Sequence, residues 1–211
     1  MILALDETDG AKAMSVAEQV SDLVDAIKIN WPLVLSTSPR TITDLSKLAP
    51  VICDFKVADI PNTNRLIVEQ AVSLGASGVI VHGFVGSDSV RAAVATAKDA
   101  DIFVVTEMSH PGGTEFTAPN AERLARIAVE SGARGVIAPA TRPERIKHIR
   151  DIIGDLLILS PGVGAQGGKA SDALRNGADY IIVGRAIYGS NEPRRAAEAI
   201  VEEARSASLH K

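Results

Sequence analysis

Gly75-Ala-Ser-Gly-Val-Ile-Val81 recurs in altered form as Gly132-Ala-Arg-Gly-Val-Ile-Ala138 and Gly177-Ala-Asp-Tyr-Ile-Ile-Val183. Each copy begins with a glycine, which can adopt the left-handed conformation that closes a helix, and continues into a short run of β-branched apolar residues. Each copy therefore predicts the end of a helix, a turn and the next strand. Its recurrence along the chain indicates a repeated helix and strand unit.

Similar short apolar runs alternate with longer amphipathic segments on both sides of these three copies, a pattern typical of βα units around a parallel sheet. Most of the runs are too short and too apolar to be half-exposed strands, so we expect them to be buried on both faces. The eight runs lie at residues 2–5, 26–29, 51–55, 78–82, 102–106, 135–138, 157–160 and 180–183. A doubly wound open sheet usually has fewer strands. We therefore predict an α/β protein in which residues 1–211 form a single-domain (β/α)8 TIM barrel.

Length and composition favour one soluble domain and argue against several classes of partner. The chain has 211 residues, of which 46% are hydrophobic, and a formal net charge of −4 that opposes binding to nucleic acid or anionic membranes. No apolar stretch approaches the roughly 20 residues that span a bilayer. Met1 is followed by no basic segment, so we expect neither a signal peptide nor a membrane anchor. The single cysteine, Cys53, lies in an apolar run and predicts a buried, inert thiol and a cytoplasmic location.

Charged residues gather at the ends of the first three predicted strands, where the active site of a barrel lies. Asp54 and Lys56 alternate with Phe55, so both charges should point into the barrel mouth while Phe55 faces the helices. On the second strand Lys28 lies between two isoleucines, and Asp6 shares the parity of the inward positions of the first strand. One ordinary ion pair would explain Asp54 and Lys56 alone. Charges from three consecutive strands favour a functional site instead.

A phosphate site is predicted from two segments that follow the seventh and eighth strands, the usual phosphate position in such barrels. The first segment is Ser160-Pro-Gly-Val-Gly-Ala-Gln-Gly-Gly168, and the second is Val183-Gly-Arg185. Backbone N–H groups near Gly184 can approach an anion, the Arg185 guanidinium can bind it through two hydrogen bonds, and Gln166 adds a neutral donor. A glycine-rich loop by itself is usually only a turn, and the following Gly-Arg pair is what favours phosphate binding.

The four histidines do not predict a metal site. His82, His110, His148 and His210 show no clustered spacing of metal ligands, so we expect no dependence on a metal ion. His148 and His210 are interpreted as surface residues. His82 lies at a strand end and is interpreted as a hydrogen-bonded structural residue outside the catalytic set.

The segment Asp54-Phe-Lys-Val-Ala-Asp59-Ile-Pro-Asn-Thr63 resembles the signature segment of the orotidine 5′-monophosphate decarboxylase family. The resemblance covers nearly the whole chain, and the short length is similar to that of the family's archaeal branch. The other matching segments occur in the family's order and are Leu3-Ala-Leu-Asp6, Lys28 with Pro32-Leu33, Val81-His-Gly83, Glu107-Met-Ser-His110, Ser160-Pro-Gly-Val-Gly-Ala-Gln166 and Val183-Gly-Arg185.

The resemblance implies an activity, a set of catalytic residues and the absence of a cofactor. The family converts orotidine 5′-monophosphate (OMP) to UMP and CO2 in pyrimidine biosynthesis, which makes its members carbon–carbon lyases. By resemblance, Lys56 donates the proton to C6 of the pyrimidine, and Asp54 lies against the departing carboxylate. Lys28 and Asp59 complete an alternating charge network. Electrostatic stabilisation is physically reasonable, because the ring does not directly delocalise the C6 carbanion.

The resemblance also implies the substrate contacts and a homodimer. Asp6 would bind the ribose hydroxyls and Ser109 the pyrimidine ring, while Pro161, Gln166, Gly184 and Arg185 complete the set of substrate-binding residues. Asp59, Ile60 and Thr63 would enter the neighbouring subunit's site. The chain departs from the family at Asn30, where glycine is frequent. Trp31 is interpreted as a core or interface packing residue rather than a platform for a base.

Two alternatives on the same fold stay open. One is a related branch of sugar-phosphate decarboxylases and aldolases, which carries the Asp54, Lys56 and Asp59 pattern together with Mg2+. In that branch an acidic residue occupies the place of Lys28. In the ribulose-phosphate epimerase relatives, histidines and aspartates in that region bind a metal ion. A non-catalytic barrel that binds a phosphorylated ligand would leave Lys56 and Asp59 without a task, although a fold alone never proves activity.

Overall fold

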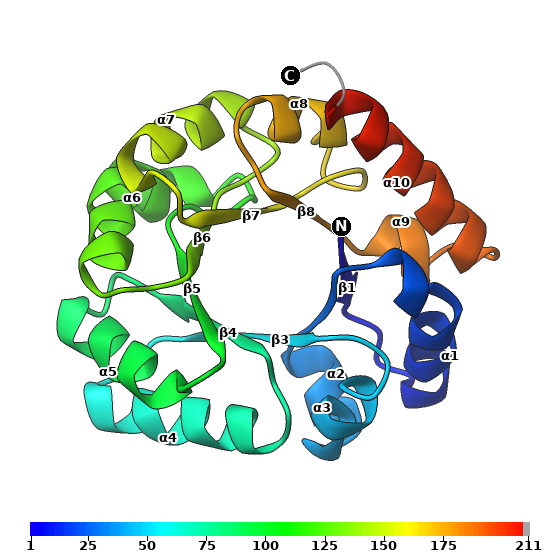
Figure 1. Cartoon of the computed structure of the whole chain (residues 1–211), viewed down its shortest axis with the longest axis horizontal. Coiled ribbons are helices and arrows are strands. Elements are labelled where there is room, and N and C mark those ends of the chain that lie inside the picture. Colours follow the sequence, from blue (N-terminus) through cyan, green and yellow to red (C-terminus); the bar gives the residue numbers. More distant parts are fainter. Residues whose placement is uncertain (209–211) are drawn as a thin grey trace.

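The structure, a computed structural model, describes residues 1–208; His210 therefore lies outside the described residues. Within that range, eight parallel strands close into a barrel in sequence order, and Figure 1 shows the helices arranged around it. The predicted (β/α)8 barrel is confirmed. The strands are β1 (Ile2–Leu5), β2 (Ala26–Ile29), β3 (Val51–Val57), β4 (Gly78–His82), β5 (Asp101–Val105), β6 (Gly135–Ile137), β7 (Leu157–Pro161) and β8 (Tyr180–Val183).

The helices of the described residues connect these strands and cover the outside of the barrel (Figure 1). None of them is long and apolar enough to cross a membrane. They are α1 (Gly10–Val20), the short 3-10 helix η1 (Ser21–Leu23), α2 (Trp31–Ser36), α3 (Arg40–Leu45), α4 (Pro61–Ser73), α5 (Ser87–Ala97), α6 (Gly113–Glu130), α7 (Pro143–Ile153), α8 (Ala170–Arg175), α9 (Arg185–Tyr188) and α10 (Pro193–Ser208).

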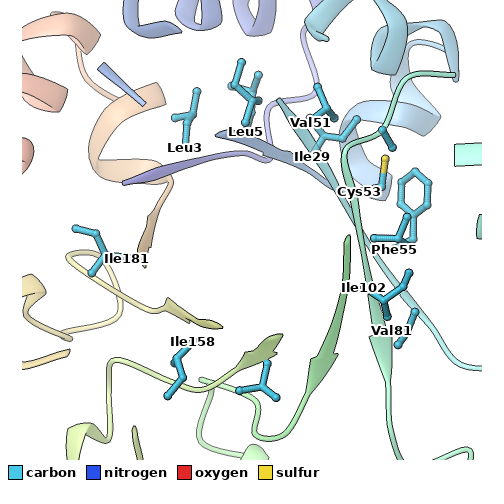
Figure 2. Packing of buried hydrophobic residues seen from close by; sticks show 14 of the residues in the cluster. Leu3, Leu5, Ile29, Val51, Cys53, Phe55, Val81, Ile102, Ile158 and Ile181 are labelled. Atoms are coloured by element: carbon cyan, nitrogen blue, oxygen red, sulfur yellow. The ribbon is translucent and has the colours of Figure 1, made fainter. Parts of the chain in front are cut away.

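Buried apolar residues form two layers because the strands are covered on both faces. Outward residues such as Leu3, Cys53 and Phe55 belong to a large cluster between strands and helices, and Figure 2 shows their side chains pointing away from the barrel. Inward residues such as Ile52 and Ile80 belong to a second cluster that fills the barrel. This alternation confirms that Phe55 faces the helices, and it leaves Asp54 on the inward side.

The third strand departs from regular pairing at its carboxyl end. Cys53 pairs with Val79 and Val57 with Val81, so the register between β3 and β4 shifts across the charged segment. Within it, Lys56 has a φ of 44°, a left-handed conformation that side chains other than glycine rarely adopt. The strand therefore continues to Val57 rather than ending at Phe55 as predicted, with local strain at Lys56.

Candidate active site

A cavity of about 310 Å3 lies at the carboxyl ends of the strands, the end of the barrel where the sequence predicted a site. Its volume lies in the range of small-molecule sites. Nine of the twelve predicted site residues line it, namely Asp6, Lys28, Asp54, Lys56, Ser109, Pro161, Gln166, Gly184 and Arg185. The other three, Asp59, Ile60 and Thr63, do not line the cavity of their own chain.

Four charged side chains, one from the residue after β1 and the others from β2 and β3, form an alternating row on the wall of the cavity. The two carboxylate oxygens of Asp54 accept hydrogen bonds from different lysines, from Lys28 Nζ at 2.6 Å and from Lys56 Nζ at 2.9 Å. Asp6 Oδ1 lies 3.8 Å from the Lys28 ammonium, beyond hydrogen-bond distance. The register of the strands explains this convergence, since Ala4 pairs with Lys28 and Lys28 with Ile52, two residues before Asp54.

The members of this row, Asp6, Lys28, Asp54 and Lys56, differ in exposure. The side chains of Lys28 and Asp54 are 7% and 9% exposed, whereas that of Lys56 is 31% exposed. Burial by itself would raise the pKa of Asp54, but the two ammonium groups and their hydrogen bonds outweigh burial and hold its pKa below the usual value. Asp54 is therefore an anion at neutral pH, and Lys56 is the lysine that a ligand in the cavity can reach most easily.

An aromatic stack supports the back of the β3 segment. The rings of Trp31 and Phe55 lie 4.3 Å apart, and Trp31 Nε1 donates to the Phe55 carbonyl oxygen at 3.1 Å. Trp31 thus packs against Phe55 of its own chain, but its side chain is 41% exposed, so it is not a core residue, and its packing at an interface stays a prediction. The stack fixes the backbone between Asp54 and Lys56 from outside the barrel.

The loop after β7 and the start of α9 form the opposite rim of the cavity. Gly162, Gly164 and Gly167 have φ angles of 99°, 75° and 90°, and the backbone N–H of Gly168 donates to the Gly162 carbonyl at 3.0 Å. At the end of β8, a Cβ on Gly184 would lie 3.1 Å from the Ala4 carbonyl oxygen, so a larger residue would disturb the first strand. The following Arg185 is exposed.

Asp59 and Ile60 lie in the exposed turn between β3 and α4, and Thr63 lies in the first turn of α4. Asp59 Oδ1 accepts from the Ile60 backbone N–H at 2.7 Å, and the Asp59 N–H donates to Asn64 Oδ1 at 3.0 Å. The Ile60 side chain is 63% exposed. These residues are thus held at the surface near the barrel mouth, and they are free to contact another molecule.

A second buried carboxylate, Glu107, lines the cavity and was given no function by the sequence analysis. It is fully buried just after β5, and its two oxygens accept from Arg142 Nε at 2.6 Å and Arg145 Nε at 2.8 Å. The same guanidinium groups also donate to backbone, Arg142 to the Met108 carbonyl and Arg145 to the Ala118 carbonyl. This cluster ties the loop that carries Ser109 to the start of α7.

The interpretation of His82 as a hydrogen-bonded residue is wrong for one ring nitrogen, because its buried Nδ1 has no partner among the described residues. Burial, with a smaller contribution from the positive charge of Lys56, lowers the pKa of His82 to about 4. His148 is exposed and pairs with Glu122, as expected for a surface residue. Among the described residues, no three His, Cys, Asp or Glu side chains are grouped so as to hold a metal ion.

Several cavity residues were not predicted to be in the site. Period-two counting along β5 would have found Glu107, because it has the parity of the inward residues Phe103 and Val105. Tyr188 lies three positions after Arg185, nearly one helical turn further along. The remaining unpredicted lining residues are Ala4, Asn30, Ile80, Val105, Met108, His110, Ile137, Gly162, Val163, Ala165 and Ile182.

Known proteins resemble this chain over nearly its full length. The model of the orotidine 5′-phosphate decarboxylase / HUMPS family matches residues 1–200. The orotidine 5′-phosphate decarboxylase of Methanosarcina mazei is 59% identical over 206 residues, which cover 96% of this chain and 94% of that protein. The orotidine 5′-phosphate decarboxylase of Methanococcoides burtonii is 57% identical over 206 residues, which cover 96% of both chains. The Methanocaldococcus jannaschii decarboxylase complexed with inhibitor BMP has a TM-score of 0.93 at 47% identity and 97% coverage of both chains. For the Pyrococcus horikoshii decarboxylase the TM-score is 0.90 at 50% identity, covering 97% of this chain and 99% of that one.

Proposed function

The chain belongs to the orotidine 5′-phosphate decarboxylase / HUMPS family, and we propose that the charged cavity at its barrel mouth is the decarboxylation site. Its activity is that of a carboxy-lyase, which converts OMP to UMP and CO2 in pyrimidine biosynthesis. The observation that carries the assignment of the site is the Lys28–Asp54–Lys56 contact, in which one buried carboxylate joins two ammonium groups. The catalytic domain would comprise the whole chain, residues 1–211.

Lys56 is the proton donor in this proposal. When the bond from C6 to the carboxylate breaks, its electron pair stays on C6 and CO2 leaves. The Lys56 ammonium then transfers a proton to C6, becomes a neutral amine and recovers a proton from water. Before that transfer, its positive charge stabilises the carbanion, which is the part of the reaction where a fixed charge lowers the barrier. Its partial exposure to the cavity supports this assignment.

Asp54 and Lys28 prepare Lys56 for this step. Asp54 binds Lys56 through one oxygen and Lys28 through the other, so the position of the Lys56 ammonium is fixed before substrate arrives. The substrate carboxylate would lie beside the Asp54 anion and lose an unfavourable contact as CO2 departs. Preorganised groups of this kind need little rearrangement in the transition state.

The opposite rim would bind the phosphate. Arg185 is exposed and has no ion pair among the described residues, while Gln166, Pro161 and Gly184 lie beside it on the cavity wall. A guanidinium suits a phosphate because it offers two parallel hydrogen bonds. With the phosphate there, the reacting ring would lie toward Lys56, the ribose near Asp6 and the pyrimidine edge near Ser109.

A homodimer would complete the site. Asp59, Ile60 and Thr63 do not reach the cavity of their own chain, and Ile60 exposes most of its side chain. In a dimer with two-fold symmetry they would enter the neighbouring cavity, where Asp59 extends the charge row beyond Lys56. No membrane or nucleic-acid partner is included in the proposal, and the location would be the cytoplasm.

The proposal needs no metal ion, and this distinguishes it from the Mg2+-dependent relatives. The test is to mix the purified protein with EDTA and OMP and to follow the loss of orotate absorbance. We expect full turnover with EDTA present. No turnover would refute the proposed site chemistry, and turnover restored only by Mg2+ would assign the chain to the metal-dependent branch.

Complementation tests the shared site. Lys56→Ala and Asp59→Ala proteins, each nearly inactive alone, are unfolded together and refolded as a mixture. Random pairing makes half of the dimers mixed, and each mixed dimer has one undamaged site, so activity should approach about a quarter of the wild-type value. Mixed dimers without recovery would show that Asp59 does not act across the interface.

A further inference from the structure

Asn30 lines the cavity beside Asp6 and Lys28. The last paired residues of β1 and β2 are Leu5 and Ile29, so Asp6 and Asn30 are the next residues of two neighbouring strands. Neighbouring strands lie ~4.8 Å apart, which places these two positions side by side at the mouth of the barrel. A ligand group that reaches Asp6 therefore also reaches Asn30.

The orientation of the Asn30 amide is fixed by one hydrogen bond. Its Oδ1 accepts from the Trp31 backbone N–H at 2.7 Å. Because a backbone N–H can only donate, the oxygen must face Trp31, and the NH2 group must point elsewhere. Trp31 is itself held by its stack on Phe55 and its bond to the Phe55 carbonyl. Among the described residues, the Asn30 NH2 group has no hydrogen-bond partner, so its donors remain available.

Asp6 offers the complementary group. Its Oδ1 is buried without a hydrogen-bond partner among the described residues, although the residue as a whole is partly exposed. Lys28 does not satisfy it, because the ammonium lies 3.8 Å from this oxygen and 2.6 Å from Asp54. A buried acceptor without a partner is costly, so a ligand that donates to Asp6 is favoured there.

We propose that Asn30 and Asp6 together recognise a vicinal diol, with the Asn30 NH2 group donating to one ribose hydroxyl and Asp6 accepting from its neighbour. Asn30 is then a specificity-determining contact for ribonucleotide over deoxyribonucleotide substrates. A donor beside an acceptor fits two adjacent hydroxyls, and neither group alone distinguishes a diol from a single alcohol. This inference rests on the proposed function, since it places the substrate ribose against β1 and β2.

The test compares Asn30→Ser with the wild type on OMP and on its 2′-deoxy and 3′-deoxy analogues. Serine is a good helix N-cap, so it keeps an acceptor for the Trp31 N–H but removes the amide donor. We expect kcat/KM for OMP to fall about 3- to 10-fold. One of the two deoxy analogues lacks the hydroxyl that Asn30 binds. With that analogue, Asn30→Ser should change kcat/KM by less than about 2-fold, because the contact between the amide and the hydroxyl is already absent.

Two further variants separate recognition from folding. Asn30→Asp keeps the shape and the N-cap acceptor but places a second negative charge beside Asp6, so it should reduce kcat/KM for OMP more than Asn30→Ser does. Asn176→Ser, an asparagine substitution remote from the cavity, should change neither substrate preference nor turnover. A thermal unfolding curve close to that of the wild type excludes a folding defect. If Asn30→Ser does not fold, Asn30→Asp on the same three substrates decides the question.

An equal loss on OMP and on both analogues would overturn this inference and leave the proposed function intact. Absence of OMP turnover by the wild-type protein would overturn the proposed function, and this inference with it. A larger loss on a deoxy analogue than on OMP would also contradict the assignment, because the contact must depend on the missing hydroxyl.

Discussion

Two buried carboxylates at the mouth of the same barrel, Asp54 and Glu107, each bind two cations. Asp54 binds Lys28 and Lys56 at 2.6 and 2.9 Å, and Glu107 binds Arg142 and Arg145 at 2.6 and 2.8 Å. Both carboxylates line the cavity, so neither position nor pairing distance separates them.

The two carboxylates differ in the kind of cation that they bind. Arg142 and Arg145 each donate one further hydrogen bond to a backbone carbonyl, and a guanidinium does not release its proton at any accessible pH. No hydrogen bond beyond the one to Asp54 holds Lys56 among the described residues, its side chain is 31% exposed, and an ammonium can transfer a proton. The Glu107 cluster therefore ties loops together, whereas the Asp54 cluster contains a lysine whose ammonium can transfer a proton.

The largest expected effect is on turnover, from substitutions at Lys56. We expect Lys56→Ala to reduce kcat by more than ~10³-fold, because both the proton donor and the central cation are lost. Lys56→Arg keeps a positive charge but should lose nearly as much, since it cannot supply the proton. Circular dichroism should show both variants folded. Turnover by Lys56→Arg near the wild-type rate would remove the distinction between the two clusters.

The next largest effect is on stability, from Glu107→Ala. Removing the shared carboxylate leaves two partly buried arginines without a counter-charge, and we expect the free energy of unfolding to fall by about 3 kcal/mol. Urea denaturation measures this loss. Glu122→Ala, at an exposed glutamate paired with His148, is the matched control and should cost less than about 0.5 kcal/mol. Equal effects of the two substitutions would show that the Glu107 cluster is not a structural clamp.

Arg185 is a cation that belongs to neither cluster, and its loss should affect binding. We expect Arg185→Ala to raise KM for OMP about 30-fold through the loss of charge-assisted hydrogen bonds to the phosphate. Orotidine, which lacks the phosphate, is the control substrate, and its slow turnover should be unaffected. The same loss on both substrates would place the phosphate elsewhere.

The smallest expected effect is on the pH dependence of stability and comes from His82, which lies near Asp54 and Lys56. The pKa of His82 is lowered from the ordinary value of 6.5 to about 4 in the folded state. Between these two pH values, the His82 imidazole is protonated in the unfolded chain but neutral in the folded chain. Stability should therefore fall by about 1 kcal/mol between pH 7 and pH 5 on account of this residue, allowing for its partial exposure. His82→Gln should remove that dependence in unfolding titrations, and His148→Gln should not. A dependence unchanged in His82→Gln would contradict the assignment.

The sequence predicted the barrel and most of the charge row for one physical reason. Strands buried on both faces alternate strictly between inward and outward residues, so counting by two placed Lys28, Asp54 and Phe55 on the correct sides. The resemblance then assigned functions to positions that the pattern had already brought together. Glu107 has the parity of the inward residues of β5, but neither the pattern nor the resemblance assigned it a function.

Features that depend on distant parts of the chain could not be predicted in this way. Arg142 and Arg145 lie 35 and 38 residues beyond Glu107, and only the closed barrel brings them to the same carboxylate. The left-handed φ of Lys56 accompanies the shifted pairing of β3 with β4, which local propensity does not reveal. The 63% exposure of the Ile60 side chain agrees with its predicted place at the surface, but its extent depends on how the turn between β3 and α4 folds.

In the proposed mechanism an ammonium group at position 56 performs the chemistry, and chemical rescue can test this role without altering the rest of the site. Lys56→Cys should be inactive, and alkylation with 2-bromoethylamine would restore an ammonium at nearly the lysine position. Cys53 should not react, because it is fully buried and burial raises the pKa of its thiol to about 12.

The measurement is the rate of OMP decarboxylation by Lys56→Cys before and after aminoethylation, with iodoacetamide as the matched neutral reagent and alkylated wild-type protein as the control. We expect kcat to recover at least ~10²-fold after aminoethylation and not at all after carbamidomethylation. Equal recovery with both reagents, or no recovery from fully aminoethylated and folded protein, would show that the ammonium group at position 56 does not perform the chemistry.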